Sequence, residues 1–361
     1  MILIESLAEG GSAMKKVAVI GAGSWGTALS MVLADNGYKV SLWSHRKEQA
    51  DEILNEHTNE KYLPGVVLSD RIEGTSQLGN ALDQAAAILL VVPAKAMRDV
   101  LRQIKSSLKQ PVLFIHGVKG IEPGSFKRMS EVIEEEIPET LRTAVVVLSG
   151  PSHAEEVSLR HPTTVAVASS NLEAAKKAQD LFFNHYFRVY TNEDTVGVEI
   201  GGALKNIIAL GAGILDGLGY GDNAKAALIT RGLAEISRLG TKMGAHPLTF
   251  IGLTGMGDLI VTCTSIHSRN WRAGNLLGKG EKLDAVLQQM GMVVEGVRTA
   301  EAANALALKM NIEMPITAAI YQVLFDGKHP KDAVDELMDR DKKDEIAPLS
   351  HSLAEKIVRE Q

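Results

Sequence analysis

The residue of this sequence with the clearest chemical potential is a lysine inside an apolar segment. Between Val196 and Leu215 the only charged residues are Glu199 and Lys205, so the pattern predicts a helix that is buried on nearly all sides. Burial lowers the pKa of a lysine because it disfavours the charged form, and such a lysine can exchange a proton near neutrality. A purely structural ion pair is the alternative. Small residues on the same helical face leave room for a ligand or another backbone: Gly201, Gly202, Ala209 and Ala212.

A glycine-rich turn near the start of the chain predicts dinucleotide binding. The apolar run 15–20 is typical of a buried strand, and Gly21, Gly23 and Gly26 then follow at Gly-x-Gly-x-x-Gly spacing before a predicted helix over 27–36. In this arrangement the first glycine permits a tight turn, the second lets the backbone approach a pyrophosphate, and the third allows close helix–strand packing. The helix N-terminus then faces the phosphates. A tight strand-to-helix turn without a ligand is the alternative.

The second predicted strand, 38–43, indicates which dinucleotide binds. In NAD-specific sites an acidic residue about 20 positions beyond the glycines binds the ribose 2′-hydroxyl. No Asp or Glu follows this strand, whereas Arg46 could pair with a 2′-phosphate through its planar guanidinium. NADPH is therefore favoured, and use of both NADPH and NADH is consistent with the sequence. His45 and Arg46 could instead cap a solvated loop.

Four further polar segments lie in loop or glycine-rich contexts. Lys119 follows the predicted strand 112–115, at the end of a strand where ligands bind in open α/β sheets. Segment 149–154 makes a similar turn into a helix. Segment 257–263 offers the Asp258 carboxylate and a hydroxyl, and segment 268–270 contains an arginine. Each segment considered alone is more often a turn, a helix cap or a surface charge than part of a site.

Composition narrows the class of protein. A length of 361 residues favours two domains, and 45% hydrophobic residues suffice for packed interiors. Only 4% aromatic residues and a net charge of −6 argue against a nucleic-acid or anionic-membrane surface. The lone Cys263 excludes a disulfide framework and suits a reducing compartment, so we predict a cytoplasmic protein. His153 and His161 lack metal-ligand spacing, and no metal, P-loop or Gly-x-Ser-x-Gly elbow is predicted.

The predicted fold is an α/β, Rossmann-type doubly wound sheet followed by an all-α domain. We expect a loosely ordered extension over 1–13 that is not a secretory signal, a dinucleotide-binding domain over 14–194, and an all-α substrate-binding domain over 195–361. Met14 is a second possible start. The predicted strands, expected to be parallel, are 16–20, 38–43, 87–92, 112–115, 144–148, 164–168 and 187–190. The predicted helices after residue 194 are 196–215, 224–240, 245–253, 268–278, 283–290, 295–310 and 315–325.

Taken together and in order, these motifs closely resemble the bacterial NAD(P)-dependent glycerol-3-phosphate dehydrogenases. The resemblance extends from about Lys16 to about Glu345 and departs from the family mainly in the extension 1–13. The segments that carry it are 21–28, 117–120, 149–154, 203–207, 219–223, 257–263, 268–270, 294–296 and 314–316.

This resemblance implies reversible hydride transfer between NAD(P)H and dihydroxyacetone phosphate, which gives sn-glycerol 3-phosphate for phospholipid synthesis. It also implies a homodimer through the helical domain. Lys205 would be the catalytic acid/base, Lys119 would contact substrate and cofactor, Asp258 would hold Lys205 and the substrate hydroxyls, and Arg269 would bind the phosphate. The implied substrate-binding residues are Lys119, Gly150, Ser152, Lys205, Asn206, Asp258, Thr262, Ser268, Arg269 and Asn270. The implied cofactor-binding residues are Gly21, Gly23, Ser24, Trp25, Gly26, His45, Arg46, Tyr62, Lys119, Ala154, Arg269, Val293 and Glu295.

Two other functions compete with this one. Another two-domain Rossmann reductase could act on a different hydroxy acid, but Arg269 in segment 268–270, together with Asp258, favours a phosphate monoester. A non-catalytic NADPH-binding sensor would keep the glycines but would have no need of Lys205 in an apolar helix.

Overall fold

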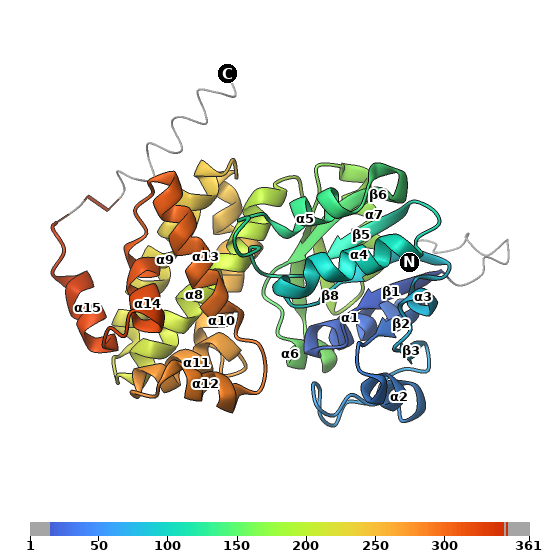
Figure 1. Cartoon of the computed structure of the whole chain (residues 1–361), viewed down its shortest axis with the longest axis horizontal. Coiled ribbons are helices and arrows are strands. Elements are labelled where there is room, and N and C mark those ends of the chain that lie inside the picture. Colours follow the sequence, from blue (N-terminus) through green and yellow to red (C-terminus); the bar gives the residue numbers. More distant parts are fainter. Residues whose placement is uncertain (1–14, 343, 346–361) are drawn as a thin grey trace, which may run out of the picture.

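The chain folds into two bodies that lie side by side, one built around a sheet and one built only of helices (Figure 1). The computed structural model describes residues 15–342, 344 and 345. The predicted extension 1–13 and the last part of the predicted all-α domain lie outside these residues. The predicted fold class, a Rossmann-type sheet followed by helices, is confirmed.

The sheet has eight strands in the order β3-β2-β1-β4-β5-β6-β7-β8. Its first six strands are parallel and follow the order typical of dinucleotide-binding domains. The strands are β1 (Lys16–Ile20), β2 (Lys39–Trp43), β3 (Ile72–Thr75), β4 (Ala85–Leu90), β5 (Val112–His116), β6 (Arg142–Ser149), β7 (Thr163–Ala168) and β8 (Phe187–Asn192).

The sheet departs from the expected parallel arrangement at one place, because β7 runs antiparallel to β6. The connection between these strands contains only the five-residue helix α6 (Ala154–Ser158). A helix this short does not carry the chain back along the sheet, as a parallel crossover requires. The structure also adds β3, which the sequence analysis missed because Ile72 is its only large apolar residue.

Helices cover the sheet and then build the second body. Those before residue 193 are α1 (Ser24–Asp35), α2 (Lys47–Asn55), α3 (Leu78–Leu82), α4 (Met97–Ser107), α5 (Met129–Glu136), α6 and α7 (Leu172–Phe182), with 3₁₀ turns η1 (Ala94–Ala96) and η2 (Glu139–Leu141). Those of the helical domain are α8 (Thr195–Gly217), α9 (Asp222–Lys242), α10 (Asp258–Thr264), α11 (Arg269–Gly278), α12 (Leu283–Met290), α13 (Glu295–Met310), α14 (Pro315–Phe325) and α15 (Pro330–Met338).

The helix α8 is the core of the helical domain. By length and composition it could cross a membrane, yet its apolar window is wholly buried inside the protein. It packs very closely against α11 through glycine. A Cβ atom on Gly213 would lie 2.0 Å from the Trp271 carbonyl oxygen, and one on Gly274 would lie 2.1 Å from that of Leu210. This close approach makes α8 and α11 one rigid unit.

Two expectations for the helical domain need correction. The helix predicted over 245–253 is instead a 3₁₀ turn η3 (Pro247–Ile251) followed by a π-helical turn η4 (Leu253–Gly257). Gly252 separates the two turns in an extended conformation, and glycine is a poor helix former. The helices α10 and α15 were also missed, because the first is short and the second is strongly polar.

Candidate active site

The carboxyl ends of the parallel strands form one edge, and most of the predicted motifs gather there. The last residues of neighbouring strands are in register, since Ile20 pairs with Trp43 and Leu90, and Leu90 pairs with His116. The strand order reverses between β1 and β4, and ligands of open α/β sheets bind in the crevice at such a point. The glycine turn and Lys119 therefore lie at neighbouring positions of the same edge.

The three glycines after β1 differ in what surrounds them. Gly21 adopts a φ of +121°, and Gly26 packs so closely that a Cβ atom there would lie 1.9 Å from the Gly21 carbonyl oxygen. The backbone itself therefore requires these two glycines. A Cβ atom on Gly23 would meet nothing within 4 Å, which leaves an open approach to the N-terminus of α1. This open space fits a pyrophosphate.

Two buried amides brace this turn, and the sequence analysis missed both. Gln49 Nε2 donates to the Ala22 carbonyl at 2.5 Å, and Asn59 Nδ2 donates to the same carbonyl at 3.0 Å. Asn59 also donates to Thr27 Oγ1 at 2.8 Å. No local pattern reveals these amides, since they reach the turn from α2 and from the loop after it.

Arg46 lies beside the same turn and contacts Tyr62. Its Nη2 donates to Gln49 Oε1 at 2.9 Å and to the Tyr62 hydroxyl at 3.3 Å, and its guanidinium lies 5.6 Å from the Tyr62 ring centroid. Ser24 Oγ donates to the Tyr62 carbonyl at 2.8 Å. Arg46, Tyr62 and Ser24 are thus brought together, whereas His45 is exposed and makes no side-chain hydrogen bond within residues 15–342.

Two buried nitrogens near the turn have no hydrogen-bond partner in the described part of the chain: Arg46 Nε and Trp25 Nε1. A Cβ atom on Gly117 would come within 2.8 Å of Trp25 Nε1, so the loop before Lys119 packs on the Trp25 ring. Buried donors without partners are costly and are typical of sites that a bound group completes. Together with the open space at Gly23, they fit a nicotinamide dinucleotide.

The predicted catalytic residues converge on one carboxylate. Lys205 Nζ donates to Asp258 Oδ1, and Lys119 Nζ donates to Asp258 Oδ2 at 2.7 Å. Lys205 also donates to Thr262 Oγ1 at 2.8 Å, and Thr262 in turn donates to the Asp258 carbonyl. Asp258 is fully buried, and Lys205 is 6% exposed. Two ammonium groups thus share one carboxylate beside the crevice.

This arrangement determines the proton affinity of Lys205. Burial is the largest influence and lowers the pKa of Lys205 to about 7. The negative charge of Asp258 opposes this shift, while the positive charge of Lys119 adds to it. Lys205 can therefore give up or accept a proton near neutrality, as the sequence analysis expected of a buried lysine.

Arg269 is tied to Lys205 through their neighbours in the sequence. Asn270 Nδ2 donates to Asn206 Oδ1 at 2.9 Å, and the Gly296 N–H donates to Asn270 Oδ1 at 2.9 Å. Arg269 itself begins α11, is exposed, and donates no hydrogen bond to any residue that the structure describes. Its guanidinium therefore remains available to an anion, next to the positive end of a helix.

The remaining predicted site residues have other local environments. Ser268 is buried and caps α11, since its Oγ accepts from the Trp271 N–H, and Ser152 Oγ donates to the Gly150 carbonyl. Glu295 begins α13, and burial raises its pKa. Ala154 begins α6, and Val293 is half-buried in the loop before α13.

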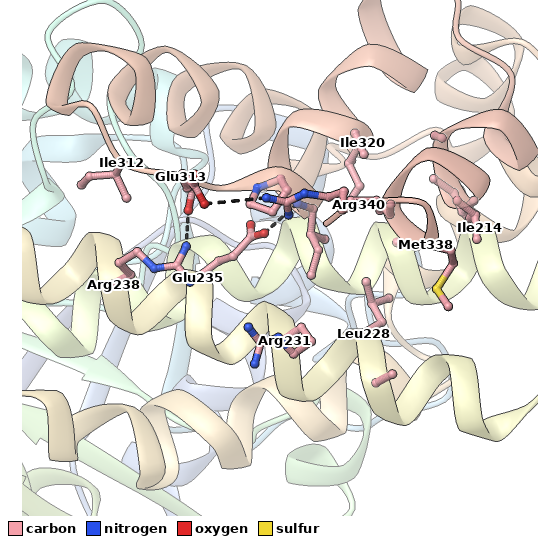
Figure 2. A pocket seen from close by; sticks show the side chains of 18 of the residues that line it. Ile214, Leu228, Arg231, Glu235, Arg238, Ile312, Glu313, Ile320, Met338 and Arg340 are labelled. Carbon is pink, nitrogen blue, oxygen red and sulfur yellow. Dashed lines mark hydrogen bonds and ion pairs between the residues drawn. The ribbon is translucent and has the colours of Figure 1, made fainter. Parts of the chain in front are cut away.

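A separate cavity of about 1060 Å³ lies in the helical domain among α8, α9, α14 and α15. Figure 2 shows Arg238 and Arg340 each joined to Glu313 at this cavity, which apolar side chains such as Ile320 also line. None of the predicted site residues lines this cavity. Glu235 is occupied there, because it accepts from the Ile316 and Thr317 N–H groups at the start of α14. Among the described residues no cluster of three or more His, Cys, Asp or Glu could hold a metal.

Comparison with known proteins identifies the family. Two family models match, the N-terminus of NAD-dependent glycerol-3-phosphate dehydrogenase over residues 16–175 and its C-terminus over residues 194–335. The chain belongs to this family. A glycerol-3-phosphate dehydrogenase [NAD(P)+] of Geobacillus thermodenitrificans is 65% identical over 343 residues, which are 95% of this chain and 100% of that protein.

Two further members support the assignment. The glycerol-3-phosphate dehydrogenase [NAD(P)+] of Bacillus cereus strain B4264 is 66% identical over 336 residues, which are 93% of this chain and 99% of that protein. The crystal structure of the glycerol-3-phosphate dehydrogenase from Coxiella burnetii has a TM-score of 0.87 and 40% sequence identity, and covers 91% of this chain and 99% of its own. The resemblance found in the sequence is therefore confirmed, and the family is one of NAD(P)-dependent oxidoreductases.

The different surroundings of the glycines predict different effects of alanine. Gly26→Ala should lower the thermal midpoint by roughly 6–12 °C, because overpacking by one methyl against the backbone costs about 3 kcal/mol. Gly23→Ala should leave the midpoint unchanged but raise the Kd for NADPH at least about tenfold, because its methyl fills the open approach.

The measurements are thermal unfolding without ligand and calorimetric titration with NADPH. A Gly23→Ala protein that binds NADPH as tightly as the wild type would contradict the role of this open space. A Gly26→Ala protein with an unchanged midpoint would contradict the packing argument.

Proposed function

We propose that this protein reduces dihydroxyacetone phosphate to sn-glycerol 3-phosphate, with Lys205 as the proton donor, and catalyses the reverse reaction with Lys205 as the base. The observation that carries the proposal is the buried contact of Lys205 and Lys119 with the two oxygens of Asp258. A reaction that moves a proton beside a developing negative charge can use such a group.

When bound, NADPH or NADH would supply the hydride that the ketone carbon of the substrate gains as its carbon–oxygen double bond becomes a single bond. Lys205 Nζ donates the proton that this oxygen gains and becomes a neutral amine. In the oxidation, neutral Lys205 accepts the hydroxyl proton. Because its pKa lies near 7, Lys205 can serve in both directions at neutral pH.

Lys119 and Asp258 orient Lys205 and set its charge. Lys119 holds Asp258 Oδ2 and the Gly150 carbonyl, so it stands between the glycine-rich segment after β6 and the buried carboxylate. Its positive charge stabilises negative charge on the substrate oxygen. Asp258 keeps the two ammonium groups together despite their repulsion, and we assign the substrate hydroxyls to the same group of residues.

Arg269 is the proposed binding residue for the substrate phosphate. A guanidinium presents two parallel N–H groups to a phosphate, and this one has no competing hydrogen bond among the described residues. The Asn206–Asn270 hydrogen bond fixes Arg269 relative to Lys205, so phosphate and carbonyl are bound at a constant separation. A phosphate-binding guanidinium at this position favours a phosphate monoester over a plain hydroxy acid as the substrate.

Several finer properties belong to the same proposal. We propose that Arg46 binds the 2′-phosphate of the cofactor, so that NADPH is favoured over NADH. Tyr62 holds Arg46 in place through its hydroxyl and its ring. We place the domain boundary at Asp194, whose side chain caps α8. A cytoplasmic location is supported by Cys263, which is free and buried.

We also propose that the protein is a homodimer joined through its helical domain. The cavity among α8, α9, α14 and α15 is open and carries apolar side chains, and Met338 at its rim is 79% exposed. Apolar surface of this kind gains free energy when a partner covers it. A second copy of the chain is the partner that the family resemblance implies.

Replacement of Lys205 tests the mechanism. Lys205→Ala should lower kcat for dihydroxyacetone phosphate by about 10²–10⁴-fold, the usual contribution of a general acid, while the Kd for NADPH changes little. Wild-type kcat for reduction should fall above pH 7, because the neutral amine cannot donate a proton. Asp258→Asn should move this decline to lower pH, because the Asp258 charge raises the pKa of Lys205.

The measurement is the loss of absorbance of the reduced nicotinamide across pH 5–10 with purified full-length protein. Near-normal turnover of Lys205→Ala would overturn the assigned role. Intact NADPH binding without turnover by the wild type would favour another hydroxy acid or the sensor.

Replacement of Arg46 tests cofactor preference. Arg46→Ala should raise the KM for NADPH by at least about tenfold, since one charge-assisted bidentate contact is worth 1.5–3 kcal/mol, and should change the KM for NADH about twofold or less. Steady-state kinetics with each cofactor provide the measurement. Equal losses with both cofactors would show that Arg46 supports the loop and does not bind the 2′-phosphate.

Two adjacent alanines of α9 test the dimer. Ala227 lines the open cavity, whereas Ala226 does not, and both are exposed. Ala227→Arg should reduce the mass in solution from two chains to one, because a buried unpaired charge opposes association. Ala226→Arg is the matched control and should remain dimeric. Light scattering after size exclusion measures the mass, and a one-chain mass for the wild type would refute the homodimer.

A further inference from the structure

We propose that Glu199 is a positioning residue, whose buried carboxylate holds α8 against the end of β5 and thereby fixes Lys205 relative to Lys119. The inference rests on the proposed function of Lys205. Glu199 is the other charged residue of the apolar part of α8, and the mechanism above does not use it. Glu199 is 6% exposed, the same exposed fraction as that of Lys205.

Within the part of the chain that the structure describes, the polar contacts of Glu199 come from the Rossmann domain. Oε1 accepts from the Ser130 N–H at 2.8 Å, and Oε2 accepts from Ser130 Oγ at 2.6 Å and from Arg128 Nη1 at 2.7 Å. His116 Nε2 lies 3.3 Å from Oε1, although without the angle of a hydrogen bond. A side chain of the helical domain is thus bound at both oxygens by the other domain.

The carboxylate is ionised in this environment. Burial by itself would raise the pKa of Glu199, but contact with His116, Arg128 and Ser130 outweighs burial and holds the pKa below its usual value. Arg128 is paired in addition with Glu131, through Nη2 and Oε1 at 3.2 Å. A buried carboxylate of this kind is strongly attached, because loss of one charged partner leaves the other uncompensated.

The position of these contacts links both catalytic lysines. His116 is the last residue of β5, and Lys119 follows it by three residues. Lys205 follows Glu199 by six residues on α8, about 9 Å along the helix axis. Between them, a Cβ atom on Gly202 would lie 2.9 Å from Ser149 Oγ and 3.7 Å from Lys119 Cγ, so α8 packs directly on this edge of the sheet.

Two attachments therefore hold α8 at the crevice. One is the Lys119–Asp258–Lys205 group, whose lysines exchange protons or contact the substrate. The other is the Glu199 group, about one and two-thirds turns away, which contacts no reacting atom. Weakening the second attachment lets α8 shift, and a small shift alters the distances on which the pKa of Lys205 depends.

The test uses full-length Glu199→Gln, a variant of nearly the same shape that removes the charge. We expect a fall in kcat of at least about tenfold, with the Kd for NADPH within about twofold, since a misplacement of about 1 Å at the reacting groups can cost up to about 10²-fold. The titration midpoint of the Lys205 ammonium, read by lysine-selective NMR, should also move. A lower melting temperature with unchanged kcat and unchanged midpoint would reduce Glu199 to a purely structural role.

A milder pair of variants covers the case in which Glu199→Gln does not fold. Ser130→Ala removes one hydrogen bond to Oε2 and should lower kcat in the same direction by a smaller factor, about two- to fivefold. Ser125→Ala is the control, because Ser125 is exposed and bonds Glu122 instead. Wild-type kcat in Ser130→Ala with an unmoved Lys205 midpoint would overturn the inference.

The NMR readout separates this inference from the proposed function. It needs no turnover, so it reports the position of Lys205 even if the wild type does not reduce dihydroxyacetone phosphate. A moved midpoint in an enzyme without that activity would keep the positioning role and reject the substrate.

Discussion

The buried carboxylate of Asp258 is the constraint on which the rest of this structure depends. Two lysines from distant parts of the chain donate to its two oxygens, and the buried one, Lys205, has its charge compensated by this carboxylate. While Lys205 is protonated, two positive charges share one negative charge, so the group then carries a net positive charge next to the crevice. Such a site suits an anionic substrate and an oxygen that becomes negative during the reaction.

This constraint explains why the helical domain is built around α8. Lys205 is buried because most side chains around it on α8 are apolar or small. The neighbouring helices can therefore approach α8 very closely and exclude water. The same burial lowers the pKa of Lys205 to about 7, close to neutral pH. The packing that buries α8 therefore has two effects, since it stabilises the helical domain and also lowers the pKa of Lys205.

The two domains contribute different halves of the site. The sheet edge offers an open approach at Gly23 and the Arg46–Tyr62 pair, which suit a dinucleotide. The helical domain offers Lys205, Asp258 and Arg269, which suit a phosphorylated ketone. Lys119 extends from the sheet edge to Asp258, so the proposed cofactor half and the proposed substrate half meet at this residue.

The sequence by itself determined the fold class, the glycine turn, the apolar helix and the lysine within it, because these depend on rules that act over a few residues. It left β3, α10 and α15 unidentified, since short or polar segments carry weak periodicity. Only the tertiary structure decided which polar groups meet. Lys205 and Asp258 are 53 residues apart, and Lys119 and Asp258 are 139 apart. Such contacts depend on the packing of whole domains, which no local pattern encodes.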